Sequence, residues 1–462
     1  MKTIIASMAA LTSLLATSCA TDGQPSATPE PSATVRSALA SVSADVSDAS
    51  LRGYIEKMVS FGTRHTLSDQ VSTTRGIGAA RRWVESEFRT MSAACSGCLE
   101  VITVQDTVTA PPRVPNATLV ANAVAIQRGA TDPNRVIIIQ GHLDSRVSDP
   151  MNFTSDAPGA NDDASGVAAV METARILSKR KFGATLVYAA LSGEEQGLHG
   201  GRILAAHAKA QGWDVLAVLN NDIVGNSRGM AATIENRVRV FSEGVRSNES
   251  EAIAAARRSV GGEVDAPSRN LARYVDAIAA AHLPSFDVSM VYRRDRFSRG
   301  GDQVPMVEAG FPAVRVTEAA EHYHRQHQDL RTENGVVYGD TIDGVDFPYL
   351  ARVTKLNAMT MATLASAPRP PREVKIDGAV SANTTVTWTA SEGAASYIVW
   401  WRDTTSPVWQ HSKIVPGATT TVLENTVIDD WFFGVQAVSA DGYASPVQFA
   451  GVVGAFFAPP VK

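Results

Sequence analysis

Three short apolar runs, each followed at once by polar side chains, constrain this chain more than any other feature. Residues 136–140 (VIIIQ), 184–191 (ATLVYAAL) and 215–219 (VLAVL) are rich in Val, Ile, Leu and Ala. Such runs are typical of buried strands in a mostly parallel sheet. Ligands bind outside the carboxyl ends of the strands in these sheets. We therefore expect the polar side chains that follow the three runs to meet at one edge of a sheet.

The side chains expected at this edge are of the types that bind zinc. In chain order they are His142, Asp144, Asp162, Glu194, Glu195 and Asp222. Asp162 lies in the loop 158–166 (PGANDDASG), before a helical pattern over residues 164–179. Imidazole and carboxylate groups are the usual ligands of catalytic zinc. One such residue alone is typically a solvated surface group, but their combination at successive strand ends and turns predicts a metal site.

A hydrolase with two zinc ions needs a bridging carboxylate, terminal ligands for each ion and a general base. We expect Asp162 to be the bridge, and His142 and Asp222 to be terminal ligands. Asp144 is placed to orient the His142 ring or a neighbouring ligand. Residues 194 and 195 are both glutamates, and successive side chains of an extended segment point in opposite directions. One carboxylate can therefore bind metal while the other takes a proton from bound water.

Three motifs resemble those of the co-catalytic zinc aminopeptidases. They are residues 141–145 (GHLDS), 158–166 (PGANDDASG) and 192–200 (SGEEQGLHG). That family includes bacterial leucyl aminopeptidases and is related to glutamate carboxypeptidase II and glutaminyl cyclases. The resemblance covers residues 51–366 and implies an α/β, three-layer zinc-peptidase fold with a central mixed β-sheet between helices. It also implies two zinc ions, Glu195 and a histidine as ligands of the second ion, and Glu194 as the general base.

The second histidine ligand is expected in the loop 321–329 (EHYHRQHQD). The family usually has a histidine four residues before an aspartate, and neither candidate here has that spacing. His327 lies two residues before Asp329, and His324 lies five before it. We expect His327 to be the ligand and keep His324 as the alternative. Tyr323 is a candidate for stabilising the oxyanion of a tetrahedral intermediate.

The function expected from these residues is that of an exported zinc aminopeptidase, which hydrolyses N-terminal residues from peptides through a metal-activated water. A carboxypeptidase or dipeptidase on the same fold is one alternative, and a glutaminyl cyclase-like enzyme with a single zinc is another. A non-catalytic receptor, as known among relatives that have lost metal ligands, is a different class of function. The retained ligand set argues against it.

The chain changes character after the PRPP segment at residues 368–371. Short alternating strands are expected at 384–389, 396–402, 419–423 and 431–438, which is typical of an all-β sandwich. This C-terminal region, residues 368–455, resembles a fibronectin type III domain. Its expected inward side chains are Trp388, Tyr397, Val399, Leu423, Phe433 and Val435. We expect a spacing or stabilising module, with adhesion as an added role that the sequence leaves open.

Residues 1–20 are predicted to be an export signal, because Lys2 precedes a mildly apolar stretch at 4–15. Cleavage after Ala20 and lipidation of Cys19 are both compatible with the sequence, so the mature protein is periplasmic, anchored to the outer membrane or secreted. Residues 21–50 are rich in Ser, Ala, Thr and Pro, which predicts a flexible linker.

Cysteine content agrees with export. Apart from Cys19, the chain contains only Cys95 and Cys98. Their spacing also occurs in redox motifs and in half of a zinc site, but no second pair completes such a site. In an oxidising compartment a local disulfide is the expected state.

Composition narrows the partners. The 462-residue chain has a formal net charge of −5, which gives no indication of nucleic-acid binding. Past the N-terminus no uncharged apolar run reaches the ~18 residues of a membrane-spanning helix. We therefore expect peptide substrates, no nucleic acid, and membrane contact only through a lipid anchor at Cys19.

Overall fold

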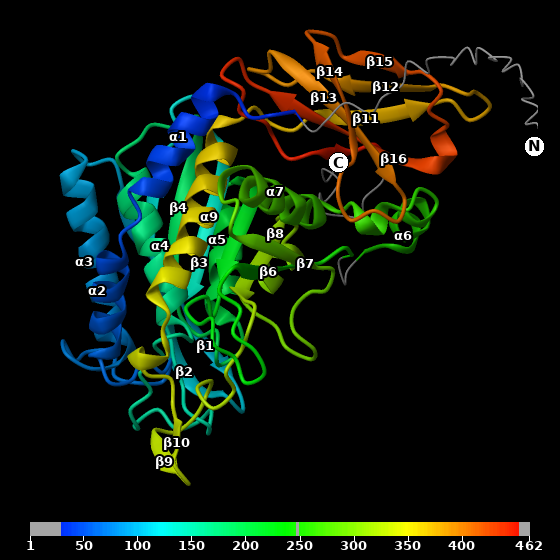
Figure 1. Ribbon diagram of the computed structural model, residues 1–462. Coiled ribbons are helices and arrows are strands. Elements are labelled where there is room, and N and C mark those ends of the chain that lie inside the picture. The colour runs from blue at the N-terminus through cyan, green and yellow to red at the C-terminus, as the bar shows by residue number, and fades with distance from the viewer. Residues whose placement is uncertain (1–28, 246–248, 452–462) are drawn as a thin grey trace, which may run out of the picture.

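The computed structural model of the chain describes residues 29–245 and 249–451. The predicted export signal at residues 1–20 lies outside these ranges. Among the described helices, none is both long and apolar enough to cross a membrane. Figure 1 shows a large α/β unit with a separate β-rich unit at one end.

A mixed sheet of eight strands forms the centre of the α/β unit, in the order β1-β2-β4-β3-β5-β8-β6-β7 (Figure 1). Its strands are β1 (Glu100–Ala110), β2 (Val114–Gln127), β3 (Asp132–His142), β4 (Ala184–Leu191), β5 (Asp214–Asn221), β6 (Arg237–Ser242), β7 (Asp287–Val291) and β8 (Ala313–Glu318). The neighbours β4-β3-β5-β8 are parallel. Strands β1 and β2 form an antiparallel hairpin, which pairs antiparallel with β4. The three apolar runs are thus adjacent parallel strands, as predicted.

Helices cover both faces of the sheet, and the pleat of each strand divides its side chains between two cores. Ile137 and Ile139 of β3 pack with the helices α1 to α4, α7 and α9. Val136 and Ile138 point the other way and pack with α5 and α8. The helices are α1 (Ala33–Ala44), α2 (Asp48–Val59), α3 (Gly76–Ala94), α4 (Ala164–Leu177), α5 (His199–Ala210), α6 (Glu251–Arg258), α7 (Pro267–His282), α8 (Gln303–Glu308) and α9 (Phe347–Ser366). The expected three-layer α/β fold is confirmed.

The prediction of a flexible linker at residues 21–50 is wrong where the structure describes it, because α1 occupies Ala33–Ala44. Ser32 caps this helix by accepting a hydrogen bond from the Val35 backbone N–H at 3.1 Å. Val35, Leu39 and Val42 are buried at helical spacing and join the main core. Three apolar side chains are enough to dock this helix on the core. The composition of the segment does not indicate them, because Ser and Ala residues surround them.

The Cys95–Cys98 disulfide is present, as expected, with a Cα–Cα distance of 5.5 Å. It lies directly after α3, and Cys95 is the C-cap residue of that helix. Both cysteines pack against the main core. The bond therefore closes the turn that leads from α3 to β1. The cysteine pair thus has a structural role, which explains it without a redox motif or a zinc site.

The C-terminal unit consists of two antiparallel sheets, β11-β12-β15 and β14-β13-β16-β17. Its strands are β11 (Arg372–Asp377), β12 (Thr384–Thr389), β13 (Ser396–Asp403), β14 (His411–Pro416), β15 (Thr420–Leu423), β16 (Trp431–Val438) and β17 (Gln448–Phe449). All six side chains that the sequence placed inward belong to one buried cluster shared by the two sheets. The all-β sandwich is therefore confirmed, while its likeness to fibronectin type III stays a prediction.

A buried ion-paired cluster attaches the sandwich to the α/β unit. Arg402 of β13 donates to Asp265, which lies just before α7, at 2.5 Å. Asp265 also pairs with Arg273 of α7 at 3.0 Å, and Arg273 donates to the carbonyl of Pro407 at 2.6 Å. The Asp265 and Arg402 side chains are 0% and 1% exposed. Because these charges are removed from water, each depends on its partners.

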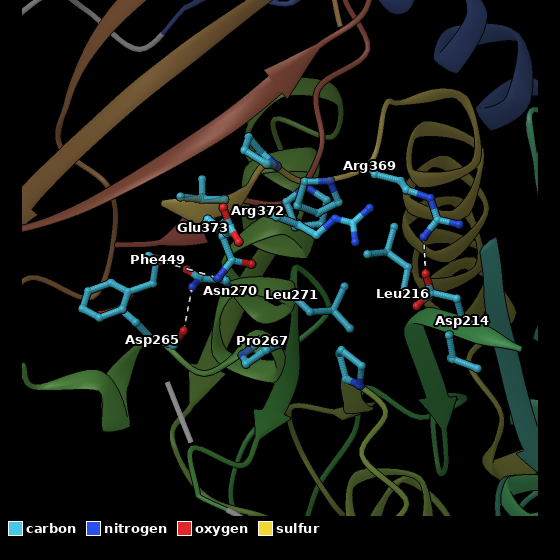
Figure 2. A pocket seen from close by; sticks show the side chains of 17 residues that line it. Asp214, Leu216, Asp265, Pro267, Asn270, Leu271, Arg369, Arg372, Glu373 and Phe449 are labelled. Carbon is cyan, nitrogen blue, oxygen red and sulfur yellow. Dashed lines mark hydrogen bonds and ion pairs between the residues drawn. The ribbon is translucent and has the colours of Figure 1, made fainter. Parts of the chain in front are cut away.

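A cavity of about 530 Å³ lies between the sandwich and the sheet, lined by Leu271 of α7, Phe449 of β17 and other residues (Figure 2). One wall is Asp214, the first residue of β5, whereas Asp222 directly follows the last residue of that strand. The cavity and the expected metal ligands therefore lie at opposite ends of β5. The sandwich is attached to the edge of the sheet that faces away from the expected site.

Candidate metal centre

The expected ligands come together at the carboxyl edge of the sheet. His142 is the last residue of β3, Glu195 follows β4, and Asp222 follows β5. Asp162 lies in the loop before α4, and His327 lies in the loop after β8. These side chains form two groups, each with ligand atoms within 4.8 Å of one another. Segments far apart in sequence thus supply one compact cluster.

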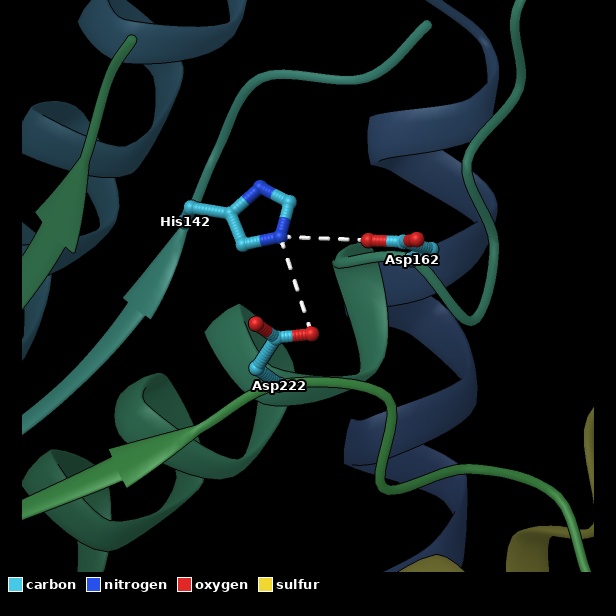
Figure 3. A group of neighbouring side chains, drawn as sticks. All are labelled: His142, Asp162 and Asp222. Atoms are coloured by element: carbon cyan, nitrogen blue, oxygen red, sulfur yellow. Dashed lines mark ion pairs between the residues drawn. The ribbon is translucent and has the colours of Figure 1, made fainter. Parts of the chain in front are cut away.

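The two groups share Asp162 through different oxygens. In the first group, His142 Nε2 lies 3.1 Å from Asp162 Oδ1 and 3.9 Å from Asp222 Oδ1 (Figure 3). In the second, His327 Nε2 lies 2.9 Å from Asp162 Oδ2 and 2.8 Å from Glu195 Oε1. This is the arrangement that a carboxylate bridge between two ions requires.

The chemistry of the donors fits zinc. Each group combines one imidazole with two carboxylates, which leaves an open position in a four-coordinate site. Glu195 Oε1 is buried, and its close polar neighbour is His327 Nε2 at 2.8 Å. Although burial lowers the pKa of His327, Glu195 and Asp162 raise it to about 9. A negative field that holds a proton this firmly is also suited to holding a dication.

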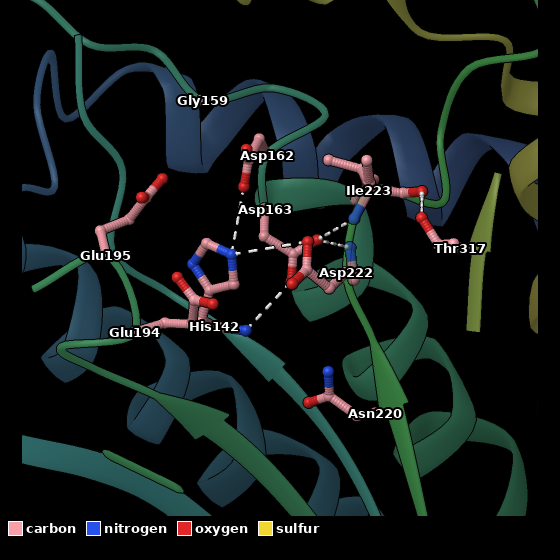
Figure 4. A network of polar contacts seen from close by, with 12 residues as sticks. His142, Gly159, Asp162, Asp163, Glu194, Glu195, Asn220, Asp222, Ile223 and Thr317 are labelled. Atoms are coloured by element: carbon pink, nitrogen blue, oxygen red, sulfur yellow. Dashed lines mark hydrogen bonds and ion pairs between the residues drawn. The ribbon is translucent and has the colours of Figure 1, made fainter. Parts of the chain in front are cut away.

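Two buried aspartates, Asp144 and Asp163, position the ligands from behind, and Figure 4 shows Asp163 beside His142 and Ile223. The backbone carbonyl of Asp144 lies 3.0 Å from His142 Nδ1, so that Nδ1 carries the proton and Nε2 faces the cluster. The Asp144 carboxylate accepts the backbone N–H groups of Glu194 at 3.2 Å and Glu195 at 3.1 Å. The Asp163 carboxylate accepts the N–H groups of His142 at 3.0 Å and Ile223 at 3.1 Å. These bonds connect the ends of β3, β4 and β5.

Two arginines hold carboxylates of the expected ligand groups in place. Arg315, whose side chain is fully buried, pairs with Asp222 at 2.8 Å. Although burial raises the pKa of Asp222, Arg315 and His142 lower it to about 2, so this ligand is ionised. Arg146 Nε pairs with Glu195 Oε2 at 2.7 Å and leaves Oε1 for an ion. Arg146 Nη2 also lies 2.5 Å from His327 Nδ1. A neutral His327 that binds metal through Nε2 carries its proton on Nδ1, so metal binding requires this guanidinium to move away from Nδ1.

Glu194 lines the same cleft but belongs to neither ligand group. Burial raises the pKa of Glu194 well above its usual value, and the carboxylates of Asp222 and Glu195 act in the same direction. A carboxylate whose pKa is raised towards neutrality is a better proton acceptor and donor for catalysis near pH 7. The adjacent glutamates therefore separate as expected, with one in a ligand group and the other free in the cleft.

The cleft has a volume of about 290 Å³. It is lined by Arg113, His142, Arg146, Asp162, Glu194, Glu195, Gly197, Leu198, Asp222, Arg296, Arg299, Gly300 and His327. All of these residues belong to the α/β unit, and the described part of the sandwich contributes none. The cleft thus brings the predicted ligands, the predicted base and four arginines into one space.

The two alternatives in the histidine-rich loop lie elsewhere. The His324 ring packs on Tyr338, with 4.7 Å between the ring centroids, and on His322. Tyr323 is 58% exposed and does not line the cleft. Neither residue is therefore placed to act on a substrate, and the structure brings only His327 from this loop into a ligand group.

Asp163, Arg315 and Asp340 were not among the site residues expected from the sequence. Asp340 is buried beside the bridging loop, and its carboxylate accepts the backbone N–H groups of Asn161 at 2.9 Å and Asp162 at 2.7 Å. Burial raises the pKa of Asp340 to about 7. These residues support the ligands from the side away from the cleft. Only a resemblance of the whole loop to known proteins could therefore have indicated them from the sequence.

Replacing Asp340 by asparagine should lower zinc affinity about 10–100-fold, as is typical when a partner of a metal ligand is removed. The amide retains one acceptor oxygen and places an NH₂ group against N–H donors of the bridging loop. Competition with a chromogenic chelator measures the affinity. Asp343→Asn is the matched control, because that side chain is 63% exposed and pairs with Arg325. Equal affinity in both variants would show that Asp340 does not position the bridge.

Comparison with known proteins agrees with this geometry. Residues 122–343 match the model of peptidase family M28. A probable zinc metalloprotease of Leptosphaeria maculans is 45% identical over 88% of this chain and 95% of its own length. One of Pyrenophora teres f. teres is 44% identical over 88% of this chain and 85% of its own length. The crystal structure of the Legionella pneumophila LapA aminopeptidase shares the fold, with a TM-score of 0.52 and 18% identity over 74% of this chain and 78% of that one.

Proposed function

The chain belongs to peptidase family M28 and is a zinc metallopeptidase, and from this premise we propose that it is an exopeptidase that removes N-terminal residues from peptides. The observation that carries the proposal is the pair of ligand groups that share Asp162, with Glu194 beside them and in neither group. Aminopeptidases are among the solved proteins with this fold, so N-terminal cleavage is the first activity to test.

Zinc in these groups would polarise the scissile carbonyl and activate a water molecule for attack. His142, Asp222 and Asp162 would hold one ion, and Asp162, Glu195 and His327 the other. Glu194 takes the proton from the attacking water on its carboxylate and passes it to the leaving amine. Asp144 fixes the backbone of both glutamates, so that one side chain binds metal while the other faces the substrate.

Two ligand groups support two zinc ions per chain. His142 and His327 lie against different oxygens of the Asp162 carboxylate. A glutaminyl cyclase-like enzyme with one zinc would not need both histidines there. Zinc content therefore separates the two functions. About two zinc per chain is expected, and one zinc together with pyroglutamate formation would favour the cyclase.

The direction of cleavage is tested with short peptides that carry either a free or an acetylated N-terminus. An aminopeptidase releases amino acids from the unblocked peptide only, because it acts on a free N-terminal residue. Equal release from both peptides would instead identify a carboxypeptidase. That second candidate, or a dipeptidase, is favoured by one observation, since four arginines line the cleft and a guanidinium suits a C-terminal carboxylate.

We also propose that the protein acts outside the cytoplasm. The charged and apolar pattern of residues 1–20 supports export, and the Cys95–Cys98 disulfide is of the kind that persists in oxidising compartments. Mass spectrometry of the mature N-terminus tests this and distinguishes cleavage after Ala20 from a lipid on Cys19.

A further inference from the structure

Four arginines line the catalytic cleft, and they come from three separate segments. Arg113 lies in the turn between β1 and β2, and Arg146 lies just after β3. Arg296 and Arg299 belong to the connection between β7 and α8. We call these four residues the arginine rim. The proposed mechanism uses only Arg146, which positions Glu195, so the charge of the other three needs a different explanation.

The carboxylates of the cleft do not neutralise the arginine rim once zinc is bound. The acidic lining residues are Asp162, Glu194, Glu195 and Asp222. Even with all four ionised, their negative charges would only balance the four positive charges that two zinc ions bring. Among the lining residues, the positive charge of the arginine rim then remains without a balancing negative charge. A cleft of this kind attracts anions and disfavours cationic groups.

Arg146 and Arg296 are already committed to carboxylates. Arg146 pairs with Glu195 at 2.7 Å. Arg296, whose side chain is 12% exposed, pairs with Glu321 at 2.9 Å and Asp295 at 3.2 Å. These two side chains are held in fixed positions and have little capacity for a further anion.

Arg113 and Arg299 are held less firmly. Arg113 is exposed, and its Nη1 donates to the backbone carbonyl of Glu195 at 2.5 Å. Among the described residues it forms no ion pair. Arg299 uses Nη1 for a long ion pair with Glu321 at 3.7 Å and for a hydrogen bond to Gln326 Oε1 at 3.4 Å. Glu321 already pairs more closely with Arg239 and Arg296. Both guanidinium groups therefore offer free N–H donors to whatever enters the cleft.

We propose that Arg113 and Arg299 bind a carboxylate of the substrate, so that the enzyme prefers peptides with an acidic group near the scissile bond. This inference depends on the proposed peptidase function and deepens it. The guanidinium fork matches a carboxylate in shape and can donate two parallel hydrogen bonds. The carboxylate can be that of an acidic side chain or that of the C-terminus of a short peptide.

The test compares two pairs of peptides of matched size. Glu-Ala-Ala-amide against Gln-Ala-Ala-amide tests an acidic side chain, and Ala-Ala-Ala against its C-terminal amide tests a terminal carboxylate. For one pair, wild type should show about tenfold higher kcat/KM on the acidic peptide, mainly through KM, as expected for a charge-assisted hydrogen bond in a partly desolvated cleft. Arg113→Gln and Arg299→Gln should each reduce this ratio several-fold, and Arg113→Lys should retain part of it.

Arg128→Gln is the matched control, because Arg128 is half exposed, pairs with Glu100 and does not line the cleft. It should keep the wild-type ratio. Equal kcat/KM within both peptide pairs would overturn the inference, and so would an unchanged ratio in both arginine variants. If wild type hydrolyses no peptide, the proposed function fails, and calorimetric binding of the same pairs to wild type then decides the inference. Tighter binding of the acidic peptide supports it, and equal binding overturns it.

Discussion

Replacing Glu194 by glutamine should lower kcat by about 10²–10⁴-fold, the range expected when a positioned general base is lost. Glutamine has nearly the same size and shape, but its amide cannot accept the proton of the attacking water. Zinc content should stay at the wild-type level, because Glu194 belongs to neither ligand group. The backbone N–H of residue 194 still donates to Asp144, so the segment that carries Glu195 should keep its position.

Kinetics on an unblocked peptide and elemental analysis of the same preparation measure these two effects. Glu235→Gln, at an exposed position of the α/β unit, is the matched control and should change neither quantity. A parallel loss of zinc and activity in Glu194→Gln would mean that Glu194 is a ligand. Retained activity would mean that another group takes the proton.

Replacing Arg402 by methionine should lower the free energy of unfolding by about 3–5 kcal/mol, the cost typical of breaking a buried ion pair by removing one partner. The substitution leaves Asp265 buried, with Arg273 as its remaining charged partner. It also removes the guanidinium that lies 4.7 Å from the centre of the Phe432 ring. Methionine fills most of the same volume, so lost packing contributes little to the effect.

Denaturant unfolding followed by tryptophan fluorescence measures the change. Arg372→Met is the control, because Arg372 is exposed and lines the cavity between the two units. The double variant Asp265→Asn with Arg402→Met should lose more stability than the single variant, since Arg273, whose side chain is 4% exposed, then loses its carboxylate partner. If Arg402→Met is as stable as wild type, the ion-paired cluster does not fix the sandwich to α7.

Much of the fold could be predicted from the sequence, since the strands beside the site are continuous apolar runs. Residues 136–140, 184–191 and 215–219 are buried on both faces, which makes their pattern unambiguous. Strand β6 was missed, because its sequence RVRVFS alternates Arg with apolar residues and lies among long loops. Helix α1 was missed for a related reason, since three buried side chains are spread over a Ser- and Ala-rich segment. Local composition cannot reveal burial that tertiary contacts decide.

The ligand cluster was predictable because its members follow strand ends, and parallel strands bring their carboxyl ends to one edge. His327 lies in a loop without such a pattern. It was therefore chosen as a ligand from its position relative to Asp329 in that loop. The residues that support the cluster could not be predicted, for a different reason. Asp340 acts on backbone N–H groups of residues 161 and 162, nearly 180 positions away, and no spacing rule connects them. The arginine rim was also unseen, because arginines from three segments meet only in the folded chain.

The most direct test of the central claim is the location of zinc in the folded protein. An anomalous difference map from crystals of the zinc-loaded wild type, recorded on both sides of the zinc absorption edge, should show two peaks. One should lie among His142, Asp162 and Asp222, and the other among Asp162, Glu195 and His327. A single peak, or two peaks that do not share Asp162, would contradict the bridged two-zinc site.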